Sequence, residues 1–367
     1  MSGYPNILIA NDSDHRRHRR LLSHAFSEKA LRGQEDIMMR YVDLLMARLA
    51  EKARAGEVVD MVRWFNFTTF DLIGDLAFGQ PFGCLSSGEY HAWVAMIFKT
   101  VKLGAFLEVI RRHPVLGILK SLLVPTELTR SHAEHWALSE QTAKRRLAGA
   151  DMRREDFVSH ILRHNDEKGM SEGEIIENAN LLIVAGSETT ATQLSGTTFY
   201  LLTNRDKYDK VVSEIRGSFE REDDITLLSV NELEYMNAVL KEGTPPEGEY
   251  IEGYWIPGNT TVSIPHLAAY HSETNFRNAD KFVPERWLGD PEYAHDARGV
   301  LQPFSVGPRN CIGMNLAYAE MRLILARLLW NFDLELMPES RSWNEQKIYS
   351  LWDKGAINVK LTPVPRE

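Results

Sequence analysis

The chain has 367 residues, of which 44% are hydrophobic and 25% are charged. These fractions are typical of soluble globular proteins, so they exclude a disordered or fibrous class, and the length is sufficient to bury a substantial core. The formal net charge of -9 argues against nucleic acid as the main partner. Two cysteines, Cys84 and Cys311, cannot form a disulfide framework, which is typical of an intracellular protein.

Helical patterns dominate the first two-thirds of the chain. Apolar residues recur at helical spacing from Ser27 to Ala53, and Gly56 follows where a helix would end. Similar patterns cover residues 71–78 (before Gly79), 93–111 and 133–147. The first eleven residues have neither the pattern of a signal peptide nor the ~20 apolar residues of a membrane span, so no anchor is expected in this chain.

A long helix is predicted in the middle of the chain. Ser171 and Glu174 form a capping-box pair, and no proline follows until well after Asn204. At 1.5 Å per residue this helix is about 50 Å long. Its segment 181–190 is apolar on nearly all sides before an acid and two hydroxyls follow, which predicts that it is buried.

Strand signals are concentrated in the last third. Residues 250–264 predict a hairpin around Pro257-Gly258-Asn259, and Asp353-Lys354-Gly355 predicts a turn between short strands. No repeat, low-complexity tract or linker divides the chain. We therefore expect a single domain over residues 1–367 that is mainly α with small β-sheets.

The most informative motif surrounds the second cysteine, and its fixed positions are Phe304, Gly307, Arg309, Cys311 and Gly313. A helical pattern follows, and amide dipoles at a helix N-terminus favour the thiolate that binds metals. Glycines let the backbone approach a flat macrocycle, and the guanidinium suits a carboxylate such as a haem propionate. The phenylalanine can shield the sulfur from solvent. An isolated cysteine would be interpreted as a small buried hydrophobe, but five fixed positions favour a ligand.

The spacing Phe-x-x-Gly-x-Arg-x-Cys-x-Gly resembles the haem-binding signature of the cytochrome P450 family. The resemblance implies the fold of that family, haem b with its iron bound by Cys311, and dioxygen as co-substrate. It also implies electrons from NADPH through a separate reductase, and no Gly-x-Gly-x-x-Gly fingerprint appears in the chain. A cysteine hydrolase is the weaker alternative, because nothing marks a histidine and an acid as partners of Cys311.

A second motif lies inside the long helix. Ala185-Gly186-Ser-Glu188-Thr189-Thr is similar to the oxygen-activation motif of the same family. Gly186 is expected to leave room for dioxygen, and the Thr189 hydroxyl can bond to a carbonyl one turn back and open the helix locally. The resemblance implies that Glu188 and Thr189 relay protons. Without the cysteine motif, a helix-packing notch would be the better interpretation.

A third motif precedes the first long helix. His15 and Arg19 are four residues apart and share a helical face, and in the family a Trp or His followed by such an Arg binds the haem propionates. Arg16 and Arg17 are expected to form a solvated basic face. A zinc site at His15 and His18 lacks further ligands at the usual spacing.

A fourth motif, Pro284-Glu-Arg286-Trp287, resembles a turn of the family whose arginine binds a Glu-x-x-Arg pair on a preceding helix. Glu242 matches the glutamate, but Pro245 stands where the arginine belongs. We therefore expect Glu242 and Arg286 to lack their shared partner, and we interpret Gly243 to Thr244 as a junction across an internal loss.

The resemblance covers about three-quarters of the family fold, because an anchor, further helices and most of a sheet would precede His15 in a full member. The segment 14–26 resembles fungal members of secondary-metabolite pathways, which implies hydroxylation of an apolar small molecule. A full-length parent would be associated with the endoplasmic reticulum membrane. The alternative is an inactive truncated form (a pseudoenzyme, splice product or mispredicted gene model) that binds haem poorly.

Overall fold

A computed structural model of the chain describes residues 3–94, 96, 107, 110, 125–149, 153–242, 266–348 and 351–366. These residues cluster in two compact units: unit 1 comprises Met1–Thr192 and Glu335–Pro363, and unit 2 comprises Gln193–Leu334 and Val364–Glu367. Each unit is described by itself, and the single domain stays a prediction. The hairpin expected over 250–264, the junction at Gly243 and nearly all of the helix expected over 93–111 lie outside the described residues.

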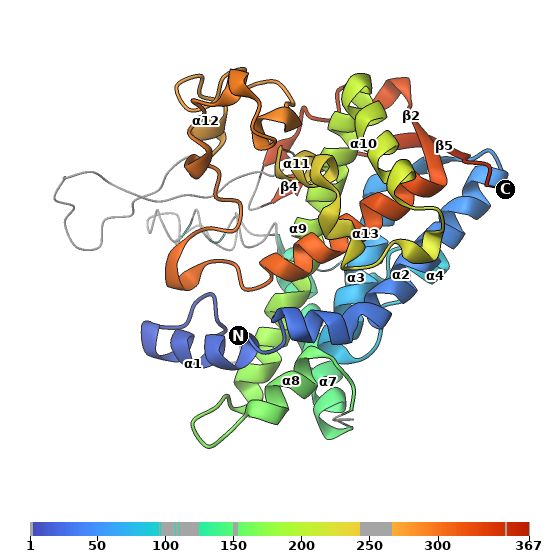
Figure 1. The fold of residues 1–367 in the computed structure, drawn as a ribbon. Helices are drawn as coiled ribbons and strands as arrows, with labels where there is room; N and C mark the ends of the chain where they lie inside the picture. Colours follow the sequence, from blue (N-terminus) through green and yellow to red (C-terminus); the bar gives the residue numbers. More distant parts are fainter. Residues whose placement is uncertain are drawn as a thin grey trace. The chain divides into compact units, whose positions relative to one another are not determined.

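Unit 1 is mainly helical (Figure 1). Its helices are α1 (Asp12–Leu22), α2 (Glu28–Arg54), α3 (Met61–Phe78), α4 (Cys84–Ser87), α7 (Thr126–Ala148), α8 (Phe157–His164) and the part of α9 (Glu172–Thr203) up to Thr192, with a 3-10 turn, η8 (Pro338–Ser340). The predicted helix after Ser27 is confirmed, and the Ser27 hydroxyl caps it by accepting from the amide of Ala30 at 3.2 Å. The helices α3 and α7 begin earlier than predicted.

The core of unit 1 is built around α3, which is buried along nearly its whole length. Phe65, Phe70 and Leu72 are fully buried, and α2 and α4 lie beside α3 (Figure 1). The helix ends as predicted at Gly79, whose φ of +74° is a left-handed conformation that glycine adopts without steric cost. An all-round apolar helix is stable only as the centre of a packed core.

Two small sheets complete the secondary structure. The strand β1 (Val58–Asp60) pairs antiparallel with β5 (Asn358–Pro363), with Val59 opposite Val359, and the sheet order is β1-β5-β2, where β2 is Phe332–Leu336. A separate pair joins β3 (Lys347–Ile348) to β4 (Trp352–Asp353). The turn predicted at 353–355 does separate short strands, β4 and β5. The fold class, mainly α with small sheets, is confirmed.

Unit 2 contains the rest of α9 and four further helices: α10 (Arg205–Ser218), α11 (Glu234–Glu242), α12 (His266–Tyr270) and α13 (Met314–Asn331). Its 3-10 turns are η2 (Glu222–Asp224), η3 (Ser229–Glu232), η4 (Pro284–Trp287), η5 (Pro291–Tyr293), η6 (Arg298–Val300) and η7 (Gly307–Arg309). The helices α10, α11 and α13 pack against one another, and Leu323, Ile324 and Leu328 of α13 are fully buried between them. This packing gives α13 a rigid base from which its N-terminal end carries the loop of Cys311.

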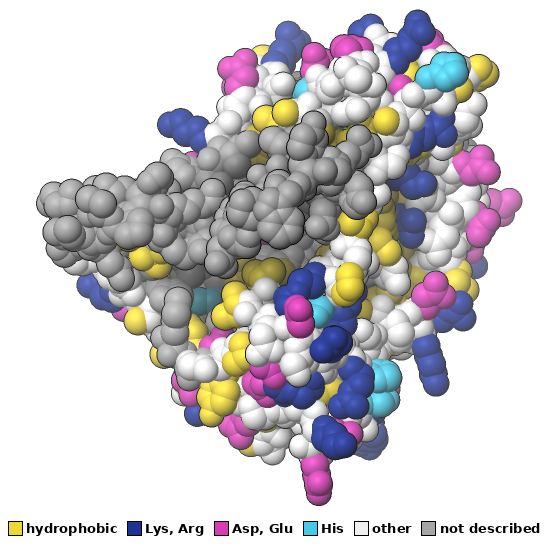
Figure 2. Space-filling model, turned by 90° about the vertical axis from the view of Figure 1, so that its left-hand side faces the viewer, with side chains coloured by type: hydrophobic (Ala, Val, Ile, Leu, Met, Phe, Trp, Pro, Cys, Tyr) yellow, Lys and Arg dark blue, Asp and Glu magenta, His cyan; other side chains and the backbone are white. Residues whose placement is uncertain are grey.

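The surface of the described residues is mixed in charge. Figure 2 shows acidic and basic side chains interspersed over the part of this face that is not grey. Within the described residues, no helix combines the length and the hydropathy needed to cross a membrane.

Candidate functional site

The loop before α13 holds the predicted metal ligand. Cys311 is exposed, and its amide donates to the carbonyl of Phe304 at 2.8 Å, while the amide of Asn310 donates to the carbonyl of Gly307 at 3.1 Å. The helix α13 begins at Met314, three residues after Cys311, and Gly313 is its N-cap residue. The prediction that Cys311 lies at the mouth of a helix is confirmed, and this position favours its thiolate.

The same loop fits a flat macrocycle. Gly307 has φ +77°, and no atom of the described residues lies within 4 Å of the place where a Cβ would stand, so this part of the structure leaves the backbone open there. Phe304 is half-buried, and its ring centroid lies 5.2 Å from that of Tyr318 on α13, which fixes the ring beside the cysteine loop. Arg309 is exposed. An exposed cysteine, an open glycine and an accessible guanidinium are therefore compatible with haem, and the individual roles of Phe304, Gly307, Arg309 and Gly313 stay predictions.

The absence of the arginine that Glu242 and Arg286 were expected to share does not leave these two residues of unit 2 unpaired. The Nε atom of Arg286 lies 2.9 Å from Oε2 of Glu242, and its Nη1 atom pairs with Asp296. The same Glu242 oxygen accepts from Nε1 of Trp287 at 2.7 Å. Because a guanidinium has five donors, Arg286 binds two carboxylates at once, and Asp296 supplies a contact that the sequence did not reveal.

The residues of the α9 motif belong to unit 1 and lie on two sides of the helix, one buried and one exposed. The Thr189 hydroxyl donates to the carbonyl of Ala185 at 2.6 Å, which confirms the predicted bond one turn back, yet α9 stays a continuous helix there. Thr189 is exposed, whereas Glu188 is only 3% exposed. The catalytic roles of Glu188 and Thr189 stay predictions.

Gly186 serves helix packing in this structure. A Cβ at this position would stand 2.7 Å from Cδ1 of Ile73 on α3, and the expected space for dioxygen stays a prediction. A side chain at this position would require Ile73 to shift, which is consistent with the helix-packing notch that the sequence left open as an alternative.

A partner of Glu188 was missed by sequence reasoning. The ammonium of Lys354 pairs with Oε1 of Glu188 and donates to Oγ1 of Thr192 at 2.6 Å. Burial raises the pKa of the Glu188 carboxyl, and the charge of Lys354 opposes that rise. Nothing in the sequence pattern could reveal this pair, because Lys354 lies in the predicted turn and 166 residues separate it from Glu188.

The third motif lies on α1, also in unit 1. His15 is buried and Arg19 is half-buried, so both occupy the inner side of the helix, and their binding of propionates stays a prediction. The expectation that Arg17 belongs to a solvated basic face is wrong. Its Nη1 and Nη2 atoms donate to both oxygens of Glu174 at 2.9 and 2.6 Å, which ties α1 to the first turn of α9.

The Arg17–Glu174 pair predicts a pH-dependent stability. Hydrogen bonds from Arg17 hold the pKa of Glu174 in the folded protein well below its usual value. The pair therefore stabilises the fold fully at pH values above the pKa of a glutamate in the unfolded chain, about 4.3. This stabilisation is lost as the pH falls to the pKa of Glu174 in the folded protein. Glu174→Gln is expected to lower the free energy of unfolding by about 1.5–3 kcal/mol at pH 7 and by less at pH 3. Urea unfolding at both pH values measures this, with Glu172→Gln, an exposed acid in the same turn, as the control.

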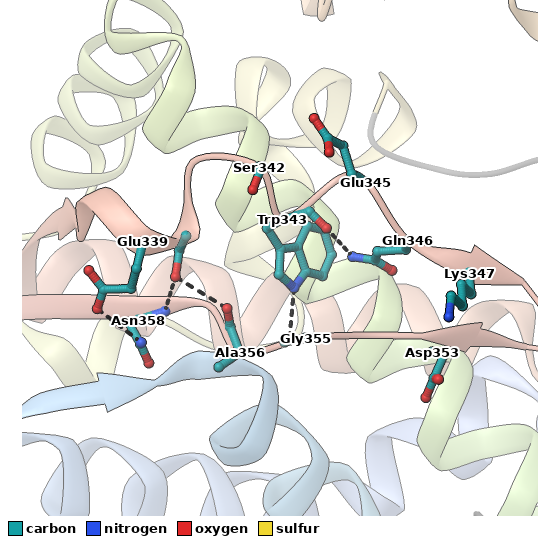
Figure 3. Close-up of a pocket in the computed structure, with 11 residues that line it drawn as sticks. Glu339, Ser342, Trp343, Glu345, Gln346, Lys347, Asp353, Gly355, Ala356 and Asn358 are labelled. Carbon is teal, nitrogen blue, oxygen red and sulfur yellow. Dashed lines mark hydrogen bonds between the residues drawn. The ribbon is translucent and has the colours of Figure 1, made fainter.

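The structure also contains a cavity of about 570 Å³ in the C-terminal part of unit 1 (Figure 3). Trp343 lies across it, donating from Nε1 to the carbonyl of Gly355 at 2.8 Å, and Gln346 donates to the carbonyl of Trp343 at 2.7 Å. The lining is mostly polar, and none of the predicted site residues belongs to it.

Comparisons with known proteins agree with the motifs. The sequence profile of the family described as Cytochrome P450 matches residues 3–243 and 247–357. The chain is 46% identical over 97% of its length to the cytochrome P450 monooxygenase aclL of Aspergillus oryzae and 47% identical over 99% to astA of Talaromyces wortmannii. It is 44% identical over 99% of its length to an averantin hydroxylase of Dothistroma septosporum. The alignments cover 76%, 76% and 72% of these relatives.

Proposed function

The chain belongs to the cytochrome P450 family, and from this we propose that it is a haem-thiolate monooxygenase that hydroxylates an apolar small molecule, a fungal secondary metabolite. Members of this family use haem, dioxygen and electrons that a reductase transfers from NADPH. The observation that carries the proposal is the position of Cys311, exposed on a loop at the start of α13. Relatives named as averantin hydroxylase and trichothecene C-4 hydroxylase support hydroxylation as the reaction.

In this proposal, five residues of the chain would hold the haem. Cys311 binds the iron through its thiolate, Phe304 limits solvent access to the sulfur, and Arg309 binds a haem propionate. The two residues of α1 that share a face, His15 and Arg19, bind propionate oxygens as well. When bound, thiolate-ligated haem supplies the cleavage of dioxygen and the transfer of one oxygen atom to a C–H bond.

Protons would be handled on α9. The Thr189 hydroxyl would accept and donate protons at Oγ1, and the carboxylate of Glu188 would be the second group that carries them. In a full-length parent we propose the endoplasmic reticulum membrane as the location and NADPH–cytochrome P450 reductase as the electron donor. The sequence contains no Gly-x-Gly-x-x-Gly fingerprint of a dinucleotide or flavin site, so the electrons are expected to come from that separate partner.

The decisive experiment is purification of the 367-residue protein with haem supplied during expression. A reduced carbon-monoxide spectrum tests for thiolate ligation, and NADPH oxidation with a fungal reductase in the presence of apolar polyketides or terpenes tests for hydroxylation. Soluble protein without haem would favour the alternative of an inactive truncated form. The missing arginine at Pro245 supports that alternative, although Glu242 and Arg286 pair with each other.

Thr189→Ala is expected to leave haem binding unchanged and to increase the fraction of NADPH that is lost as peroxide. The reason is that the exposed hydroxyl of Thr189 handles protons and does not bind the metal. Product and peroxide are measured per NADPH consumed. Thr203→Ala is the control, because its hydroxyl makes the same kind of bond to the carbonyl of Phe199, at 2.9 Å, near the end of α9. Equal product yield in both variants would remove Thr189 from the reaction.

A further inference from the structure

The ion pair between Lys354 and Glu188 is buried within unit 1. The two charged side chains are each 4% exposed, and the Lys354 ammonium also donates to Oγ1 of Thr192 at 2.6 Å. The Thr192 hydroxyl in turn donates to the carbonyl of Glu188 at 2.7 Å. The lysine therefore contacts two side chains that are one turn apart on the same side of α9.

The segment that carries Lys354 is held in place although it has no regular secondary structure. The carbonyl of Gly355 accepts from Trp343 at 2.8 Å, and the carbonyl of Ala356 accepts from the Ser340 hydroxyl at 3.2 Å (Figure 3). With the residues after Lys354 tied down in this way, its side chain has a defined starting point from which to reach α9. The contact with Glu188 is thus imposed by the fold of the C-terminal segment.

This contact holds Glu188 away from Thr189. Consecutive residues of an α-helix point in directions about 100° apart. Glu188 points to the buried side, toward Lys354, whereas Thr189 is exposed and bonded to Ala185. The second oxygen of Glu188, Oε2, is buried and has no hydrogen-bond partner among the described residues. A half-satisfied buried carboxylate depends strongly on the one cation that it contacts.

We propose that Lys354 is a positioning residue for Glu188: it holds the carboxylate on the Thr192 side of α9, and the carboxylate reaches the Thr189 side only by leaving Lys354. This inference rests on the proposed function, in which Glu188 and Thr189 handle protons. It adds that the C-terminal segment around Lys354, and not the motif in α9 alone, decides whether the acid is available.

Infrared spectroscopy of the holoprotein tests the contact without turnover. In Lys354→Met, the buried Glu188 has lost its cation and becomes protonated, so an additional neutral-carboxyl band is expected at pH 7 in the difference spectrum against the parent protein, in which burial already raises the pKa of Glu320 well above its usual value. The band is expected to be lost in the double variant Lys354→Met/Glu188→Gln. It should also be absent from Lys354→Arg, which keeps the charge, and from Lys360→Met, a matched change at an exposed lysine of β5.

The groups around Glu188 make this spectrum interpretable. Tyr90 is a titratable neighbour; its pKa is raised to about 12, mainly by burial, so it stays neutral over the range tested and contributes no carboxyl band. Thr192→Val serves as a second variant, because it removes one of the two partners of Lys354 without removing a charge. If Lys354→Met folds poorly, Thr192→Val is measured in its place, and it is expected to show a weaker neutral-carboxyl band.

A second readout separates positioning from a purely structural role. The pH profile of product formed per NADPH should show an additional ionisation in Lys354→Met that the double variant lacks. Folded Lys354→Met without the additional neutral-carboxyl band, or with the parent's pH profile, would overturn the inference while hydroxylation by the parent would still support the proposed function. Conversely, the expected band in a protein that never hydroxylates would uphold the position of Glu188 and refute the function.

Discussion

Replacing Cys311 by alanine is expected to abolish the red-shifted carbon-monoxide band that marks thiolate-bound ferrous haem. The reason is that Cys311 is exposed at the start of α13, where amide dipoles favour the thiolate, and that its loop is open around Gly307. The measurement is the difference spectrum of the dithionite-reduced protein with carbon monoxide.

The chain contains its own control for this prediction. Cys84 is fully buried in unit 1, where the amide of His91 lies 3.3 Å from its sulfur. Burial raises the pKa of the Cys84 thiol to about 11, so it stays a thiol at neutral pH. Cys84→Ala should therefore keep the band. Survival of the band in the Cys311→Ala protein would show that another group ligates the iron.

Arg286→Met is expected to cause a large loss of stability, about 3–5 kcal/mol out of a typical total of 5–15 kcal/mol. The Arg286 side chain is 3% exposed and contacts Glu242 and Asp296, whose side chains are 9% and 3% exposed. Removing the guanidinium leaves two buried carboxylates without their cation. It also removes two cation–π contacts, because Cζ of Arg286 lies 5.5 Å from the ring centroid of Phe276 and 5.1 Å from that of Tyr293.

Urea unfolding followed by circular dichroism measures this loss. Arg221→Met is the matched control, because Arg221 pairs with Asp223 at 2.9 Å while the two side chains are 72% and 79% exposed. Such an exposed pair is expected to contribute little to stability. If Arg286→Met changed the unfolding free energy no more than Arg221→Met does, the buried pairs of Arg286 would not stabilise the fold.

Features that depend on near neighbours in the chain were predictable from the sequence. The capping box is confirmed, since the amide of Ser171 donates to Glu174 at 2.8 Å, and α3 ends at Gly79. The cysteine motif could be recognised because its spacing is fixed by one loop and one helix start. The bond from Thr189 to Ala185 followed from helix geometry alone.

Tertiary structure alone decided which groups meet across the chain. The sequence predicted that Glu242 and Arg286 lack a shared arginine, and it could not show that Asp296 pairs with Arg286. It offered no sign that Ile73 fills the space beside Gly186 or that Lys354 binds Glu188 from 166 residues away. Hydrophobic periodicity and caps report local conformation, whereas buried ion pairs and close helix contacts depend on how separate elements pack. The sequence by itself therefore determined the family and several of the helices and predicted Cys311 as the metal ligand, whereas packing decided the environment of the acid on α9.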